Sequence, residues 1–291
     1  MLILLSDAFD ASLPGKLKKY GEVTDDKARL PEAEIVLIRS KTKVTREYID
    51  GAPKLKMVIR GGVGLDNVDQ VYAKEKGIIV YNTASASSIA VAELAFAMMI
   101  AMPNRLVEAD TSMHAGQWLK KELKRTELYG KILGILGLGR IGSEIGKRGK
   151  AFGMKVIAYD PFVKTSEVAE MKSSIKDLLA VSDYISLNMP LTDDTKGMLN
   201  KETLAHCKKG ARIINTGRGK CVIEEDIVAA LGSGQLAGYA TDVWYSDPPE
   251  NSPLMKAPNV LMAPHIGASS NENLLRIGEI VDELIGKYVK K

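Results

Sequence analysis

The sequence predicts an α/β protein with two doubly wound parallel-sheet domains, in which a larger domain is inserted into a smaller, flavodoxin-like one. Its 291 residues exceed a typical single domain of about 100 to 150 residues. Short aliphatic and β-branched runs alternate with helix-length segments, which is typical of parallel sheets covered by helices on both faces. One glycine-containing unit of strand, turn, helix and strand, Lys131 to Pro161, lies near the centre of the chain.

The first part of the chain predicts the smaller sheet. The expected strands are residues 2–5, 35–38, 57–59 and 78–81, with helices such as 45–50 and 67–77 between them. A long apolar run, Ile89 to Met102, predicts a buried helix that ends at Pro103. Glu93 interrupts this run, which is shorter than the roughly 20 residues that a membrane helix needs, so we expect no membrane partner.

From Ile132 onwards the alternation predicts a second, larger sheet. The expected strands are 132–136, 155–159, 184–188, 212–215, 239–243 and 259–262, and the expected helices are 140–151, 173–181, 200–207 and 224–235. Six strands with crossover helices describe a Rossmann domain. The final segment, 270–291, has apolar residues at helical spacing, and we expect it to return to the first domain. The predicted domains are therefore 1–97 with 270–291, and 98–269.

A glycine motif follows the first strand of the larger domain. Gly137, Gly139 and Gly142 stand in GxGxxG spacing, which permits a tight turn, close approach of a pyrophosphate, and close helix–strand packing. Asp160, at the end of the next strand, can accept hydrogen bonds from the adenine ribose and would repel a 2′-phosphate. The motif therefore predicts NAD as the cofactor, rather than NADP or a phosphate-free turn.

Composition narrows the class of partner. A net charge of +4 and a pI near 8.8 do not by themselves indicate nucleic-acid binding, and they suit a small anionic substrate equally well. Cys207 and Cys221 lack zinc or redox spacing, which indicates a reducing, cytoplasmic location. The chain begins without the basic segment of a signal peptide. His114 and His206 have too few partners for a metal site, so we expect none.

Reactive residues follow three strands of the larger domain. They lie in the segments 215–219, 242–247 and 264–267. Ligands of open α/β sheets bind beyond the carboxyl ends of strands, so these segments are candidates for an active site. The Arg218 guanidinium suits a substrate carboxylate and carbonyl oxygen, and His265 can exchange a hydroxyl proton because histidine titrates near neutral pH. Arginine, carboxylate and histidine beside a nicotinamide are what hydride transfer to or from a 2-hydroxy acid requires.

Four motifs resemble those of the D-isomer-specific 2-hydroxyacid dehydrogenase family, and nearly the whole chain fits that family. The motifs are GILGLGRIG (134–142), INTGRG (214–219), ATDVW (240–244) and APHIGAS (263–269). The resemblance implies that Arg218 and His265 are catalytic. Asp247 stands where the family usually has glutamate, so its contact with the imidazole is expected to be longer, water-mediated or rebuilt by a backbone shift, with Glu250 as the alternative carboxylate.

The same resemblance implies further cofactor contacts. Arg140 and Ile141 are expected over the pyrophosphate, and Asp242 near the nicotinamide carboxamide. The other residues expected at the cofactor are Asn188, Pro190, Thr216, Gly217, His265, Gly267 and Ala268.

The segments from Arg39 to Thr45 and from Arg60 to Asp69 resemble the branch of this family that acts on 3-phosphoglycerate. Arg39 and Arg60 are expected to bind the substrate phosphate, and the backbone at Val63 and Gly64 the carboxylate, with Arg218 and His265 completing the substrate contacts. Lys41 and Lys43 fit this role and an ordinary exposed role equally well.

The resemblance implies NAD-dependent oxidation of D-3-phosphoglycerate to 3-phosphohydroxypyruvate, in serine biosynthesis. It also implies a homodimer formed through the cofactor domain, with the helix from Ile89 in that surface. Because the chain ends at Lys291, no C-terminal regulatory domain is expected. Two alternatives stay open: a glyoxylate or hydroxypyruvate reductase with the same catalytic residues, and an NAD-sensing binding protein without turnover.

Overall fold

The computed structural model describes residues 1–290 and divides into two compact units. Unit 1 comprises Met1–Ala90 and Ala268–Lys291, of which Lys291 lies outside the described residues, and unit 2 comprises Val91–Gly267. Both units are built on a parallel sheet with helices, so the predicted fold class is confirmed. The domain boundaries expected from the sequence, at 97/98 and 269/270, lie a few residues away from this division and stay a prediction.

Unit 1 holds a five-stranded sheet in the order β2-β1-β3-β4-β5. Its strands are β1 (Leu2–Leu5), β2 (Glu22–Thr24), β3 (Ile35–Ile38), β4 (Met57–Arg60) and β5 (Ile79–Asn82). Every pairing is parallel, and the order is that of flavodoxin-like sheets. The four predicted strands are present. The sequence did not predict β2, because this short edge strand is not buried and lacks an apolar run.

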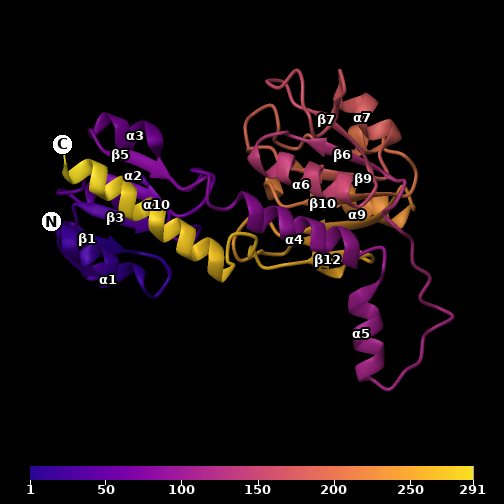
Figure 1. Ribbon diagram of the computed structural model, residues 1–291, viewed down its shortest axis with the longest axis horizontal. Helices are drawn as coiled ribbons and strands as arrows, with labels where there is room; N and C mark the ends of the chain where they lie inside the picture. The colour runs from indigo at the N-terminus through magenta and orange to yellow at the C-terminus, as the bar shows by residue number, and fades with distance from the viewer. Residues whose placement is uncertain (291) are drawn as a thin grey trace. The chain divides into compact units, whose positions relative to one another are not determined.

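Alternating side chains give the sheet of unit 1 two apolar faces. Its helices are α1 (Leu13–Leu17), α2 (Arg46–Asp50), α3 (Gln70–Glu75) and α10 (Asn271–Val289). On one face Ile277, Val281 and Ile285 of α10 pack in the cluster that contains Ile3 and Leu37, and the other face is covered by α2 and α3. Figure 1 shows α10 lying along these strands. The C-terminal helix thus returns to the first sheet, as its apolar spacing predicted.

Unit 2 holds a seven-stranded sheet in the order β12-β11-β10-β9-β6-β7-β8. Its strands are β6 (Ile132–Leu136), β7 (Lys155–Tyr159), β8 (Glu170–Met171), β9 (Tyr184–Leu187), β10 (Ala211–Asn215), β11 (Leu236–Thr241) and β12 (Val260–Met262). All pairings are parallel, and the chain reverses direction across the sheet between β6 and β9. The six predicted strands are present, and the two-residue strand β8 is an addition at the edge.

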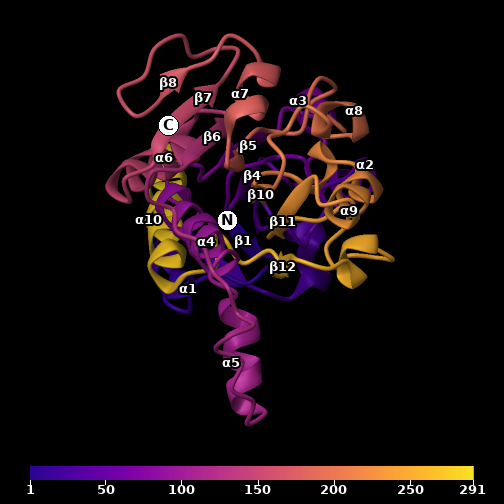
Figure 2. The ribbon, with the colours of Figure 1, turned by 90° about the vertical axis from the view of Figure 1, so that its right-hand side faces the viewer.

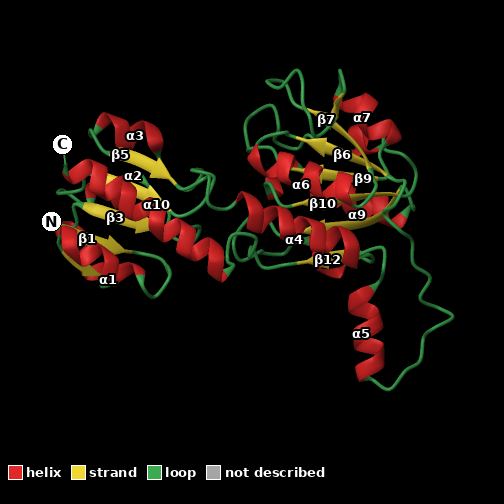
Figure 3. Ribbon diagram, viewed as in Figure 1, coloured by secondary structure: helices red, strands yellow, loops and turns green. Residues whose placement is uncertain are grey.

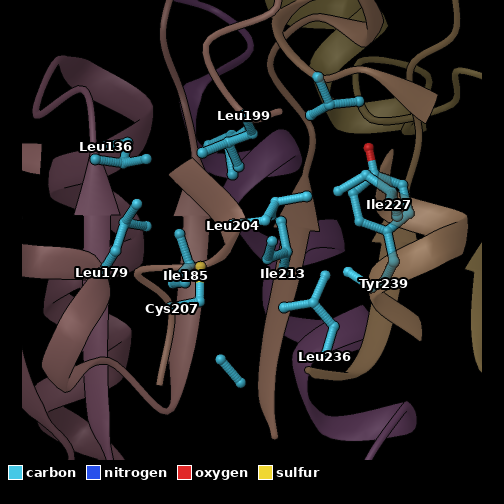
Figure 4. Close-up of a cluster of buried hydrophobic side chains, with 14 of the residues drawn as sticks. Leu136, Leu179, Ile185, Leu199, Leu204, Cys207, Ile213, Ile227, Leu236 and Tyr239 are labelled. Atoms are coloured by element: carbon cyan, nitrogen blue, oxygen red, sulfur yellow. The ribbon is translucent and has the colours of Figure 1, made fainter. Parts of the chain in front are cut away.

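Helices cover both faces of the sheet in unit 2 (Figure 3). They are α4 (Ser88–Ala101), α5 (Leu106–His114), α6 (Arg140–Ala151), α7 (Ile175–Val181), α8 (Lys201–Leu204) and α9 (Glu224–Gly232). Short 3₁₀ segments are η1 (Lys18–Tyr20) and η2 (Lys27–Glu32) in unit 1, and η3 (Gly219–Cys221) and η4 (Pro253–Lys256) in unit 2. Figure 4 shows the core under α7, α8 and α9, where Ile185, Ile213 and Tyr239 meet side chains from the helices. The opposite core is closed by α4 and α6.

The apolar helix predicted from Ile89 is α4, and it is mostly buried within the chain. Phe96, Met98 and Met99 belong to the core of unit 2, so these side chains are not free for a partner. Helix α5 extends away from the rest of unit 2 (Figure 2). Among the described residues, no single helix is long and apolar enough to cross a membrane, although α4 and α5 together, bent by 66°, reach that length and composition.

Candidate active site

The candidate residues of unit 2 follow neighbouring strands at one edge of the sheet. Gly137 comes after β6, Asp160 after β7, Arg218 after β10, Asp242 after β11 and His265 after β12. Because all these strands are parallel, their carboxyl ends lie on the same edge. The edge includes the point between β6 and β9 where the strand order reverses, which is where open α/β sheets bind ligands.

The glycine turn has a shape that suits a pyrophosphate. Gly137 has a φ of 87°, which residues with a β-carbon rarely adopt. Gly139 precedes α6 as its N-cap and supplies no side-chain cap, so the first N–H groups of the helix stay available for an anion. A β-carbon at Gly139 would meet nothing within 4 Å, whereas one at Gly142 would lie 2.2 Å from the Gly137 carbonyl oxygen.

Asp160 is tied to the glycine turn. Its Oδ2 accepts the N–H of Leu138 at 2.8 Å, and its Oδ1 accepts the N–H of Phe162 at 2.9 Å. The half-buried carboxylate therefore fixes both its own loop and the turn that follows β6. Each carboxylate oxygen can accept more than one hydrogen bond, so this arrangement is compatible with a ribose contact.

The remaining cofactor candidates of unit 2 line the same strand ends. Arg140 is exposed and Ile141 half-buried on the first turn of α6. The N–H of Asn188 donates to the Leu136 carbonyl oxygen at 2.8 Å. The carbonyl oxygen of the exposed Pro190 accepts a hydrogen bond from Thr195 Oγ1 at 2.7 Å.

The hydroxyl of Thr216 indicates a polar ligand at this edge of the sheet. Within residues 1–290, the buried Thr216 Oγ1 finds no hydrogen-bond partner. A buried polar atom without a partner is costly in a folded protein. The open space at Gly139 and this Thr216 hydroxyl fit a polar ligand that carries phosphate groups, as NAD does.

Arg218 stands in a turn that a buried amide side chain builds. Asn215, which is fully buried, accepts the Gly217 N–H at 3.1 Å and donates from Nδ2 to the Arg218 carbonyl at 3.0 Å. Arg218 itself is half-buried and donates from Nη1 to the Gly217 carbonyl at 2.8 Å. Sequence patterns do not predict this role of Asn215; its place at the end of a buried strand is the available signal.

Asp247 contacts His265 directly. Its Oδ2 is paired with Nδ1 of the imidazole, and both side chains are about one-third exposed, at 35% and 33%. Of the three expected geometries, a longer or water-mediated contact is wrong, because the shorter side chain reaches the ring. With the carboxylate accepting from Nδ1–H, the neutral imidazole presents Nε2 as a proton acceptor.

The loop that carries Asp247 is anchored at both ends. Tyr245 Oη donates to the Val222 carbonyl at 2.6 Å, and Ser252 Oγ donates to Glu224 Oε2 at 2.6 Å. Burial raises the pKa of Glu224, a shift that the Ser252 hydrogen bond opposes. Sequence patterns do not predict the contact of Glu224 with Ser252, because it joins separate segments of the chain.

Asp242 is buried and lies under the turn that contains His265. Its two carboxylate oxygens accept the N–H groups of Ile266 and Gly267, at 2.8 and 2.7 Å. Burial raises the pKa of Asp242, while the two N–H groups and the His265 imidazole act in the opposite direction.

In unit 1, Arg39 follows β3 and sits in an ordered loop. Its N–H donates to Asp7 Oδ2 at 2.6 Å, and its Nη2 donates to the carbonyl of Ala268 at 3.0 Å. Asn67 Nδ2 donates to the carbonyls of Arg39 and Thr42, each at 2.7 Å. Burial lowers the pKa of the Arg39 guanidinium, and Asp7 partly offsets this. Ala268, a cofactor candidate, thus binds Arg39 within this unit.

The second predicted anion-binding segment of unit 1 follows β4. The half-buried Arg60 ends that strand, and its guanidinium lies so close to Gly62 that a β-carbon there would be 2.7 Å from Arg60 Nη1. The Val63 carbonyl accepts a hydrogen bond from Asn82 Nδ2 at 2.7 Å, and Gly64 is half-buried.

In the described part of the chain, no group of three or more His, Cys, Asp or Glu could hold a metal ion.

The comparison with family models decides the family. Residues 96–267 match the model of the D-isomer specific 2-hydroxyacid dehydrogenase, NAD binding domain. This chain belongs to that family. The chain is 43% identical to D-3-phosphoglycerate dehydrogenase of Methanocaldococcus jannaschii, over 90% of this chain and 51% of that protein. It is 42% identical to hydroxypyruvate reductase of Thermotoga maritima, over 88% of this chain and 85% of that protein.

Solved structures of family relatives share the fold. D-lactate dehydrogenase from Aquifex aeolicus, complexed with NAD and lactic acid, is 29% identical with a TM-score of 0.89, over 100% of this chain and 96% of that one. The chain spans about half the length of the first phosphoglycerate dehydrogenases it matches, 51% and 57%. Unit 2 is accordingly the family's NAD binding domain, with its glycine turn between β6 and α6.

Proposed function

We propose that the protein is an NAD-dependent D-2-hydroxyacid dehydrogenase, and that it oxidises D-3-phosphoglycerate to 3-phosphohydroxypyruvate. The observation that carries this proposal is the pairing of Asp247 with His265 Nδ1 on the same sheet edge as the glycine turn. An imidazole oriented by a carboxylate, beside a nucleotide site, is suited to proton exchange with a substrate hydroxyl.

Each catalytic residue has a separate role in this proposal. NAD, when bound, supplies the acceptor for the hydride from C2 of the substrate. His265 takes the hydroxyl proton at Nε2, and Asp247 keeps the ring oriented and stabilises its charged form. Arg218, whose backbone Asn215 holds, donates to the substrate carboxylate and to the oxygen that becomes the carbonyl.

The choice of a phosphorylated substrate rests on Arg39 and on the relatives. Arg39 and Arg60 lie at the carboxyl ends of adjacent strands of unit 1, where two guanidinium groups suit a doubly charged phosphate. Several relatives at 39–43% identity are phosphoglycerate dehydrogenases. We propose that the activity serves serine biosynthesis in the cytosol.

The second candidate function is a hydroxypyruvate or glyoxylate reductase. The relative from Thermotoga maritima favours it, because the two chains match over most of both lengths. This enzyme would use the same Arg218, Asp247 and His265 but would be indifferent to a phosphate on the substrate.

The decisive experiment measures NADH formation with D-3-phosphoglycerate, D-glycerate and D-lactate at equal concentrations, with His265→Ala as the blank. The proposal expects a clear preference for the phosphorylated acid that is lost in the blank. Turnover of the unphosphorylated acids alone would support the reductase. Absence of turnover with every acid in both directions, with NAD still bound, would favour an NAD-sensing binding protein.

We also propose that the protein forms a homodimer, through the segment that begins with α5 rather than through α4. Four apolar side chains of this segment are at least half exposed, namely Leu106, Val107, Met113 and Trp118. Burying such a patch against a second copy would remove apolar surface from water. Sedimentation of the wild type and of Val107→Glu with Trp118→Ser tests this, since a monomer in both would contradict it.

A further inference from the structure

The backbone at His265 has an unusual conformation. Its φ of 57° lies in the left-handed region, which residues with a β-carbon seldom adopt. The next two N–H groups, of Ile266 and Gly267, point at the carboxylate of Asp242. A residue in this region persists only when its surroundings hold it there.

Asp242 is placed to hold the turn at His265 in this conformation. It follows β11 directly, is only 2% exposed, and uses one oxygen for each N–H. Bidentate acceptance from two consecutive N–H groups fixes both the position and the direction of the turn. A β-carbon at position 267 would lie 2.9 Å from Asp242 Oδ2, so this contact would have to shift.

We infer that Asp242 is a positioning residue for His265, acting through the N–H groups of Ile266 and Gly267. The imidazole is then fixed from two sides, by Asp242 through the backbone and by Asp247 at Nδ1. This inference rests on the proposed function, in which His265 exchanges the substrate proton, and it adds a role that a contact of Asp242 with the cofactor does not supply.

Two substitutions test in different ways whether Asp242 holds the turn at His265. Asp242→Asn keeps the shape but replaces one acceptor by an NH₂ group, which cannot accept from the opposing N–H. Gly267→Ala keeps the carboxylate and pushes a methyl group against it. The matched control is Asp183→Asn, because Asp183 also accepts a backbone N–H, that of Ile132 at 2.9 Å, but precedes β9 at the other end of the sheet.

The first measurement is histidine NMR of the cofactor-free protein. The chain has three histidines, so His265→Ala identifies the signal of His265. Both test variants are expected to shift or broaden that signal and to leave those of His114 and His206 in place, whereas Asp183→Asn leaves all three in place. An unchanged His265 signal in Asp242→Asn, or the same change in Asp183→Asn, would overturn the inference.

The second measurement separates positioning from cofactor binding. Both test variants are expected to lower kcat about 100-fold, the scale expected for misplacement of a reacting group by about 1 Å, with a much smaller change in the Kd for NAD. A Kd that rises in proportion to the loss of kcat would make Asp242 a cofactor ligand instead and contradict the inference. If the wild type shows no turnover, the proposed function fails, while the NMR result still decides whether Asp242 holds the turn.

Discussion

A β-carbon at Gly142 would lie 2.2 Å from the carbonyl oxygen of Gly137, whereas one at Gly139 would meet nothing within 4 Å. The two glycines therefore serve different purposes. We expect Gly142→Ala to destabilise the fold by about 1–3 kcal/mol, as overpacking does, because the turn and α6 must move apart. Gly139→Ala should leave the unfolding midpoint unchanged and weaken NAD binding. Thermal unfolding and NAD titration of both variants check this; the reverse pattern would contradict the assignment.

The short aspartate beside His265 is expected to be necessary for turnover. Asp247→Asn should lower kcat by about 100-fold or more, within the range that positioned acid–base groups contribute, because the amide neither carries charge nor reliably accepts from Nδ1–H. Glu250→Gln is the control, since Glu250 is the nearby alternative on the same exposed loop. Loss of turnover in Glu250→Gln with an active Asp247→Asn would show that Glu250 supports the imidazole.

Asp160 is expected to distinguish NAD from NADP. Asp160→Ala should raise the Kd for NAD by about tenfold, as loss of a hydrogen bond to a charged group does, and change that for NADP less. Asp160→Asn keeps an acceptor for the Leu138 N–H and so separates loss of the ribose contact from loss of the turn. Equal weakening for both dinucleotides would remove the ribose assignment.

Arg39 is expected to select the phosphorylated substrate. Arg39→Ala should raise KM for D-3-phosphoglycerate by about tenfold or more, through loss of a charge-assisted contact, and leave KM for D-glycerate unchanged. Lys41→Ala and Lys43→Ala, at exposed positions of the same loop, test whether these lysines share this role. Because Arg39 also donates to the Ala268 carbonyl, the unfolding midpoint must be compared; equal effects on both substrates would contradict a phosphate contact.

Asp183 makes stability depend on pH. Burial raises its pKa, but the Ile132 N–H and Lys208 outweigh this and lower it below the usual value. A lowered carboxylate pKa stabilises the fold above the unfolded value of about 4 and loses this contribution as pH falls through the folded value. Asp183→Asn should cost about 1 kcal/mol at pH 7 and progressively less below pH 4. Unfolding measured from pH 7 to 3 checks this, with the exposed Asp194→Asn as control.

Local patterns along the chain were enough to predict the fold class. Parallel strands buried on both faces must be apolar almost throughout, so short apolar runs predicted β3 and β9. The glycine turn could be predicted equally well, because its steric requirements involve only residues that are close in sequence. The edge strands β2 and β8 were missed, since a short, exposed strand carries no such pattern.

The sequence alone therefore determined the alternation of strands and helices, the dinucleotide turn and the return of the last helix to the first sheet. Tertiary structure alone decided that Asp247 reaches His265 and that Asp242 holds Ile266 and Gly267. The physical reason is range: secondary structure follows from side-chain periodicity between near neighbours, whereas these hydrogen bonds join two loops that only the pairing of β11 and β12 brings together.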